Sequence, residues 1–121
     1  KKKKNLTLGI LGLAYKENTD SLKNSPSIYL IHRLKNKNIS VFDPVVKKII
    51  KKTNITYANS VNELLSEINI LFIMTPWKIF KNIDINLLTS NKIKIIIDPY
   101  GILISQRANL EIKNIKYFSL T

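Results

Sequence analysis

The amino-acid sequence alternates short apolar runs with segments of helical periodicity, and this alternation limits the fold more than any other feature. Runs that are apolar almost throughout are typical of strands buried on both faces of a parallel sheet. The runs predict strands over 5–15, 39–44, 55–58, 69–76, 93–101 and 114–120, the last of them at an edge. Strands that alternate with helices predict an α/β fold, a Rossmann-like three-layer sandwich with a mostly parallel, open sheet.

Capping residues and helical periodicity predict the segments between the strands. Ser25 suits an N-cap and Pro26 the first helical position, while Ser60 with Glu63 three residues later forms a capping-box pattern. These signals predict helices over 25–38, 45–53, 59–68, 84–91 and 102–110. No repeat, linker or second domain interrupts the pattern, so we expect residues 1–121 to form a single domain.

Composition narrows the class of protein. The chain has no cysteine, which removes disulfides, thiolate metal sites and a cysteine nucleophile. No apolar run is long enough to span a bilayer. The basic N-terminus and the apolar residues after it fit a strand better than a signal peptide, because charge returns at Lys16 without a cleavage pattern. We therefore expect a cytoplasmic protein that binds neither a membrane nor a metal.

The formal net charge of +12 suggests an anionic partner. Lysine outnumbers arginine by 18 to 2, and the lysines are spread along the chain. Base recognition and bidentate phosphate binding favour arginine over lysine. A basic nucleic-acid-binding module is therefore kept only as an alternative.

Polar or aromatic residues follow four of the predicted strands. They are Tyr15–Lys16, Asp43–Pro44, Thr75–Trp77 and Asp98–Gly101. Because ligands of open parallel sheets bind at the carboxyl ends of the strands, these clusters predict a site at one edge of the sheet. Lys16 is well placed there to meet an anionic ligand, the alternative being one more surface lysine.

The run of Gly9, Gly12 and Ala14 starts like a dinucleotide-binding turn. Such a turn needs its third small residue to open a helix whose amides hold the pyrophosphate. Here the helix is predicted to begin only near residue 26. We therefore expect no cofactor site at this turn, and interpret the small residues as allowing close packing against helices.

Other candidate residues have structural explanations. Asp43 and Asp98 each precede a proline, so a turn or cap role is favoured over ribose binding. His32 lies in a predicted helix with no metal-ligand spacing around it, and we assign it no acid–base role. Trp77 and Phe80 are expected to anchor a loop into the core rather than to stack on a base. No catalytic triad or pair of carboxylates emerges from the spacing.

Three stretches of the sequence resemble the C-terminal domain of the UDP-glucose/GDP-mannose dehydrogenase family. GILGLAYKENTDSLKNSP is similar to the family pattern G-L-A/S-F/Y-K-x-x-T/S-D/G-D-x-R-x-S-P. TPWKIFK is similar to its T-x-W-x-x-F segment, and IIIDPYGIL to its D-G/P-R/Y/F-x-I/L/V segment. Together they cover nearly the whole chain in the right order.

The resemblance implies a function and a domain organisation. Members of the family oxidise the 6-hydroxyl of a nucleotide sugar to a carboxylate with two NAD⁺, for surface polysaccharide synthesis. By this resemblance, residues 1–121 are the UDP-sugar-binding C-terminal domain. The NAD-binding domain, the central dimerisation region and the catalytic cysteine lie outside the chain. We expect the chain to act as part of a homo-oligomeric enzyme whose substrate is a UDP-sugar, and to contain no catalytic residue itself.

The resemblance also assigns residues. Lys16 matches the lysine that contacts the UDP-sugar, and Thr19 and Asp20 match the pair that shapes the following loop. Lys23 replaces an arginine that reaches toward NAD⁺, and lysine lacks the planar fork of arginine. Tyr100 stands in the stretch where several members place a substrate-binding arginine, and is left as a ring or hydroxyl contact.

A third interpretation follows from the departures from the family pattern. Ser21 stands where a second aspartate is usual, and Lys23 where an arginine is usual. These differences keep open a third hypothesis, that the chain is a non-catalytic domain derived from the same family that only mediates protein association. The sequence does not distinguish UDP-glucose from other nucleotide sugars.

Overall fold

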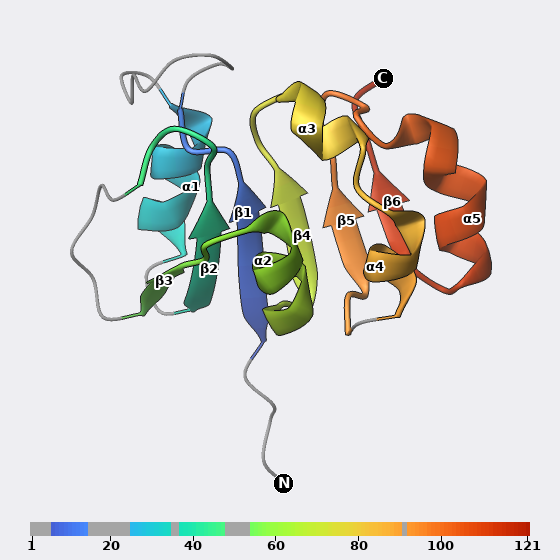
Figure 1. The fold of residues 1–121 in the computed structure, drawn as a ribbon, viewed down its shortest axis with the longest axis horizontal. Coiled ribbons are helices and arrows are strands. Elements are labelled where there is room, and N and C mark those ends of the chain that lie inside the picture. Colours follow the sequence, from blue (N-terminus) through green and yellow to red (C-terminus); the bar gives the residue numbers. More distant parts are fainter. Residues whose placement is uncertain (1–5, 15–24, 35–36, 48–53, 91) are drawn as a thin grey trace, which may run out of the picture.

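The computed structural model describes residues 6–14, 25–34, 37–47, 54–90 and 92–121. The described residues form one six-stranded sheet in the order β3-β2-β1-β4-β5-β6 (Figure 1). The strands are β1 (Thr7–Leu11), β2 (Asn38–Phe42), β3 (Ile55–Tyr57), β4 (Ile70–Ile73), β5 (Ile95–Ile97) and β6 (Lys116–Phe118). Each pair of neighbouring strands is parallel. The predicted parallel sheet and the edge position of the last strand are confirmed.

Helices cover the sheet on both faces. They are α1 (Pro26–Arg33), α2 (Val61–Glu67), α3 (Lys78–Lys81), α4 (Ile85–Thr89) and α5 (Arg107–Ile112), with a 3₁₀ turn η1 (Ile104–Gln106) before α5. The core layer under α2, α4 and α5 contains Leu64, Leu88 and Leu110, whereas Ile31 of α1 belongs to a separate buried cluster with Ile10. The predicted three-layer arrangement is thereby confirmed.

The predicted helix caps are present. Ser25 is the N-cap of α1, its hydroxyl accepting from the amide of Ile28, and Pro26 is the first helical residue. Ser60 caps α2 by accepting from the amide of Glu63 at 3.0 Å. The Glu63 carboxylate in turn accepts from the amide of Asn59, one residue before the N-cap. This is the reciprocal arrangement of a capping box, displaced by one residue.

The helix predicted over 45–53 is wrong at its start, where residues 45–47 are not helical. Residues 43–46 instead form a turn around the carboxylate of Asp43, whose Oδ1 accepts from the amides of Val45 and Val46, both at 2.8 Å. An aspartate before a proline favours such a turn, so the helical period of the sequence is not realised there. Residues 48–53 lie outside the described residues.

Two further differences concern the second half of the chain. Helix α3 was not predicted, since four residues are too few to show a helical period. The helix predicted over 102–110 begins later, with η1 preceding α5. Among the described residues, no helix is long and apolar enough to cross a bilayer.

Candidate functional site at the carboxyl edge of the sheet

The order in which the chain adds strands to the sheet reverses at β1, because β1 pairs with β2 on one side and with β4 on the other. In open parallel sheets, ligands bind outside the carboxyl ends of the strands at such a switch point. Asp43 and Asp98 directly follow β2 and β5, and Thr75 comes two residues after β4, so the structure brings three of the four predicted clusters to this edge. The fourth, Tyr15–Lys16, lies outside the described residues.

The chain leaves β1 through a short segment whose carbonyls are all bonded by buried hydroxyls. Ser27 Oγ donates to the Gly12 carbonyl at 2.5 Å, and Ser25 Oγ donates to the Leu13 carbonyl at 2.6 Å. Thr75 Oγ1 donates to the Ala14 carbonyl at 2.9 Å. We call the four side chains that hold this segment the strand-exit clamp, namely Ser25, Ser27, Asp43 and Thr75.

The fourth member of the clamp, Asp43, holds the amides of the same segment. Its Oδ2 accepts from the amide of Leu13 at 2.7 Å and from that of Ala14 at 3.2 Å. Because Oδ1 is occupied by two amides of its own turn, this carboxylate is only 2% exposed yet fully bonded. The predicted turn or cap role of Asp43 is confirmed.

The geometry around Gly12 does not fit a dinucleotide at this turn. The Leu13 and Ala14 amides, which would have to bind a pyrophosphate, already bond to a carboxylate. The negative charge of Asp43 would also repel a phosphate there. Gly9 serves packing instead, since a Cβ at this position would lie 2.5 Å from Ile68 and 2.9 Å from Leu64. The predicted close approach of this strand to a helix is confirmed.

A second turn follows β5 and is organised by Asp98. This buried carboxylate accepts from the amides of Ile102 and Leu103 at 3.0 and 2.7 Å, and from the Tyr117 hydroxyl at 2.5 Å. Its predicted turn role is confirmed. The turn carries Tyr100, which is 47% exposed, beyond the end of the sheet. The Tyr100 side chain is thus accessible to a ligand.

Burial and the hydrogen bond to Asp98 raise the pKa of Tyr117 well above its ordinary value of 10.0. We expect Tyr117→Phe to lower the free energy of unfolding by about 1–2 kcal/mol at neutral pH, because Asp98 loses a donor. The folded chain keeps Tyr117 protonated to a higher pH than the unfolded chain. The stability from this pair is therefore fully present below pH 10 and declines as the pH rises above it. Urea titrations of both proteins at several pH values measure this. A gap that widened above pH 10 would contradict the assignment.

The aromatic pair after β4 belongs to the core. Trp77 is 8% exposed and Phe80 is fully buried, which confirms that they anchor the loop. The indole Nε1 of Trp77 is buried without a hydrogen-bond acceptor in the described structure. His32 is exposed on α1. Across the described ranges, no three His, Cys, Asp or Glu side chains gather as a metal site would require.

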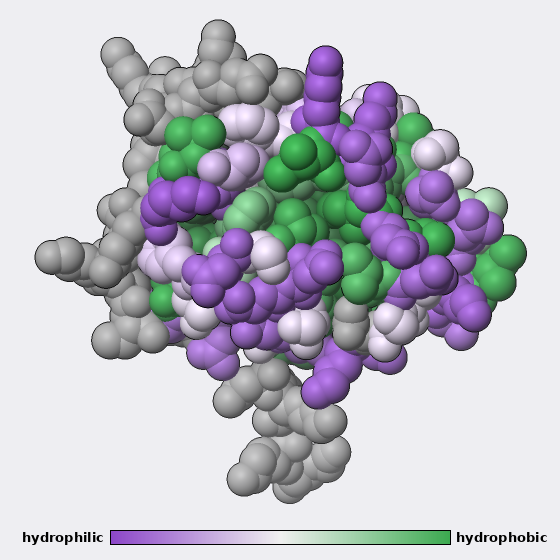
Figure 2. All heavy atoms as spheres, viewed as in Figure 1, coloured by the Kyte–Doolittle hydropathy of each residue, from purple (hydrophilic) through white to green (hydrophobic). Residues whose placement is uncertain are grey.

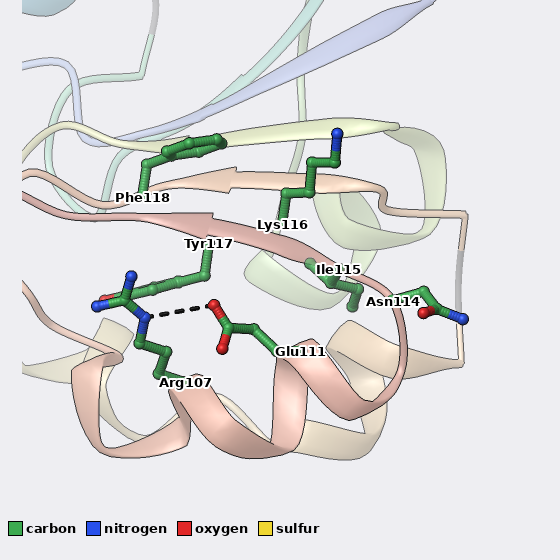
Figure 3. A pocket seen from close by; sticks show the side chains of 7 residues that line it. All are labelled: Arg107, Glu111, Asn114, Ile115, Lys116, Tyr117 and Phe118. Atoms are coloured by element: carbon green, nitrogen blue, oxygen red, sulfur yellow. Dashed lines mark hydrogen bonds and ion pairs between the residues drawn. The ribbon is translucent and has the colours of Figure 1, made fainter.

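A cavity of about 530 Å³ lies between α5 and β6 (Figure 3). Its lining includes Arg107, which pairs with Glu111 at 3.4 Å and lies 5.8 Å from the centre of the Tyr117 ring. Strand β6 is separated from β1 by β4 and β5. The cavity is therefore distinct from the carboxyl edge at the switch point.

Four of the predicted site residues lie outside the described residues, namely Lys16, Thr19, Asp20 and Lys23. Tyr100 is the predicted contact that the structure places, one turn beyond β5. The strand-exit clamp as a unit was not predicted, although Ser25, Asp43 and Thr75 were each singled out in the sequence. Its only signal in the sequence is polar residues at the ends of apolar strands.

Comparison with known proteins gives one consistent family. The model described as "UDP-glucose/GDP-mannose dehydrogenase family, UDP binding domain" matches residues 9–105. A UDP-glucose 6-dehydrogenase from Rickettsia felis is 36% identical over 87 residues, which are 67% of this chain and 19% of the relative. A UDP-glucose 6-dehydrogenase from Rickettsia bellii is 32% identical over 107 residues, which are 83% of this chain and 25% of that relative. The chain thus spans about a fifth to a quarter of these curated relatives.

Solved structures agree with this result. A UDP-D-ManNAc dehydrogenase from Pyrococcus horikoshii superposes with a TM-score of 0.67 at 28% identity, covering 82% of this chain and 22% of that one. An NDP-N-acetyl-D-galactosaminuronic acid dehydrogenase from Methanosarcina mazei superposes with a TM-score of 0.71 at 15% identity. The superposition covers 95% of this chain and 24% of that one. The second likeness concerns the fold alone. Both support the Rossmann-like α/β arrangement.

Proposed function

The chain belongs to the UDP-glucose/GDP-mannose dehydrogenase family, and from that membership we propose that it binds the uridine diphosphate part of a nucleotide sugar at the carboxyl edge of its sheet. The observation that carries the proposal is the strand-exit clamp. It fixes the chain two residues before Lys16 at the switch point, where ligands of such sheets bind.

The chemistry of the edge suits a diphosphate. Lys16 supplies a positive charge for the phosphate oxygens, and a charge-assisted hydrogen bond there is roughly twice as strong as a neutral one. Tyr100, 47% exposed on the turn after β5, offers a ring and a hydroxyl to the nucleotide or the sugar. Strands β1 and β5 flank β4, so the carboxyl ends of these two strands are about 10 Å apart, two strand spacings. That span suits a nucleotide sugar better than an isolated phosphate.

The activity proposed for the longer enzyme is oxidation of the sugar C6 hydroxyl to a carboxylate with NAD. The turn after β1 does not fit a dinucleotide, so NAD is held mainly by a domain outside this chain, the family's N-terminal NAD-binding domain. The part of this domain is to bind and orient the substrate. Lys23 reaches toward the cofactor, while Thr19 and Asp20 shape the loop between the two domains. The whole enzyme is placed in the cytoplasm, as a homo-oligomer that serves surface polysaccharide synthesis.

Thermal unfolding of the full-length protein with UDP-glucose tests the binding. At a hundredfold excess over Kd, binding adds about 2.7 kcal/mol to the folded state and raises the Tm. We expect Lys16→Ala to weaken binding by about tenfold or more, since a hydrogen bond to a charged group contributes about 1.5–3 kcal/mol. Lys113→Ala, at the exposed end of α5, is the matched control and should leave the shift unchanged. Absence of any shift with UDP-glucose, UDP or related UDP-sugars would refute the proposal.

The same protein distinguishes the nucleic-acid alternative. Phosphate-backbone binding weakens steeply as salt rises, because each neutralised phosphate releases counterions. We expect a single-stranded oligonucleotide to bind the protein only weakly, even at low salt. We also expect Lys16→Ala and Lys113→Ala to lower this oligonucleotide affinity by equal amounts. Tight oligonucleotide binding together with no response to UDP-glucose would favour the alternative.

A further inference from the structure

The cavity between α5 and β6 lies along the edge of the sheet. Its lining includes Ile115 and Tyr117, which are buried in the layer under α5. It also includes Lys116 and Phe118, whose side chains project to the opposite side of the strand (Figure 3). A space that contacts alternate residues of one strand from both sides lies beside that strand rather than over one face. Because β6 is the last strand of the sheet, the cavity follows a free edge, and we call it the edge groove.

The backbone of β6 has unpaired groups on the side of this groove. Lys116 donates its amide to the Lys94 carbonyl at 3.0 Å, and the Phe118 carbonyl accepts from the Asp98 amide at 2.8 Å. Since residues of a strand bond alternately to one side and the other, Tyr117 directs its amide and carbonyl away from β5. Neither group has a hydrogen-bond partner among the described residues. Such groups are a template for pairing with a further strand.

Helix α5 forms one wall of the edge groove and supplies a cation to it. Arg107 bonds Glu111 through Nε alone, at 3.4 Å, and its two terminal nitrogens bond no other described residue. Both side chains of this pair are about half exposed, and an ion pair of that kind adds little to stability. The guanidinium lies 5.8 Å from the centre of the Tyr117 ring, beside the free edge. It can therefore bind the carboxylate of an incoming chain with two parallel hydrogen bonds.

The two sides of β6 differ in polarity. On the face shown in Figure 2, hydrophilic side chains gather over α5, so the outer wall of the groove is polar. On the other side of β6, Phe118 is 54% exposed and offers an apolar contact. Successive side chains of an added strand point alternately to these two sides. The groove therefore matches an extended segment in which an acidic residue, toward Arg107, is followed by an apolar residue, toward Phe118.

Charge argues against a second copy of the chain as the added strand. Each copy has a formal net charge of +12, and Arg107 and Lys116 line the groove against Glu111 alone. Pairing two copies through this edge would bring like charges together, whereas an acidic segment meets a complementary surface.

We propose that the free edge of β6 binds an extended segment of a partner protein as an added strand, with an acidic residue held by Arg107 and an apolar residue beside Phe118. Main-chain hydrogen bonds to Tyr117 supply affinity, and the alternating side chains supply specificity. Because β6 has only three residues, the contact with Arg107 carries a large share of the binding. The proposal goes beyond nucleotide binding, since β4 and β5 separate this edge from β1 and leave the carboxyl edge at the switch point free.

Binding of a short peptide to the full-length protein tests the proposal. The probe is the dye-labelled, end-blocked peptide Thr-Val-Glu-Val-Thr, followed by fluorescence polarisation. We expect Arg107→Ala to weaken its binding by about tenfold or more, because hydrogen bonds between charged groups are lost. Arg33→Ala is the matched control, since Arg33 also lies over a tyrosine ring, 5.6 Å from the centre of Tyr29 on α1. Equal affinities of the two variants, or no binding of the probe, would overturn the proposal.

A second probe separates strand addition from charge attraction alone. Methyl groups on the three central backbone nitrogens of the same peptide keep its charge but remove the amides that pair with an edge strand. We expect this probe to bind about tenfold more weakly or worse, because the edge loses its hydrogen bonds and meets the methyl groups instead. Equal binding of the two probes would contradict the added strand.

Hydrogen exchange resolved to single residues identifies the occupant. The unmodified probe should slow exchange of the Tyr117 amide and leave that of Lys116, already bonded within the sheet, unchanged. Protection of the Tyr117 amide without the probe would show that a second copy, if it depends on protein concentration, or another part of the same protein, if it does not, already pairs with the edge. Either result would overturn the proposal. UDP-glucose binding is measured on the same samples and should be unaffected by the probe, so the two proposals fail separately.

Discussion

Replacing Asp43 with alanine is expected to cost the chain about 3–5 kcal/mol of unfolding free energy, because several buried amides lose their only acceptor at once. Asp43 accepts from the amides of Leu13, Ala14, Val45 and Val46. A domain of this size is stable by roughly 5–15 kcal/mol, so the loss is a large share of the total. Urea unfolding followed by the fluorescence of Trp77, the single tryptophan, measures it. UDP-glucose binding should be lost in parallel, since the segment before Lys16 is released.

Two further aspartate variants sharpen this test. Asp84 caps α4 by accepting from one amide, that of Asn86, and is exposed. We expect Asp84→Ala to cost about 1 kcal/mol, as other N-cap losses do. Asp43→Asn retains one acceptor oxygen and should fall between the two alanine variants. An Asp43→Ala protein no less stable than Asp84→Ala would show that the clamp does not hold the strand end.

The second large effect is expected from Gly12→Ala. Gly12 has φ +98°, and an added Cβ would collide with the side chain of Thr75 and lie 2.8 Å from its backbone nitrogen. Backbone strain of about 1–2 kcal/mol and a steric clash of about 1–3 kcal/mol act together, for a total of about 2–5 kcal/mol. The collision partner cannot retreat, because Thr75 is fully buried and bonded to the Ala14 carbonyl.

Gly101→Ala is the matched control for backbone strain without a rigid neighbour. Gly101 has φ +69°, and its added Cβ would meet the side chain of Thr121, which is exposed and can turn away. We expect a cost of about 1 kcal/mol for the strain alone. Equal losses for the two variants in urea unfolding would mean that Thr75 yields, and would contradict the rigid packing assigned to the strand end.

The sequence predicted the fold well where a local signal decides the structure. Ser25, Pro26 and Ser60 mark helix starts through hydrogen bonds within three residues, and the apolar runs identify the strands. The prediction over 45–53 failed at its start because the periodic pattern of apolar and basic residues there indicates a helix, whereas residues 43–46 form a turn around the Asp43 carboxylate.

The candidate site was predictable only in outline. Apolar strands ending in polar residues indicate which edge carries the site, and they gave Asp43, Thr75 and Asp98. Their bonding partners are separated from them by long stretches of chain, 30 residues from Asp43 to Leu13 and 61 from Thr75 to Ala14. Such contacts depend on the order of strands in the sheet, which the local pattern does not specify.

The clamp also sets an order of events during folding. Strand β1 is synthesised first, yet its exit is complete only after Thr75 has docked, 61 residues later. Contacts this distant in sequence form slowly, since the entropy of closing the intervening loop must be overcome first. The turn that carries Tyr100 waits longer still, for the Tyr117 hydroxyl to reach Asp98. A nascent chain that ends before β6 therefore has most of its sheet, but the turns at the carboxyl edge are completed last.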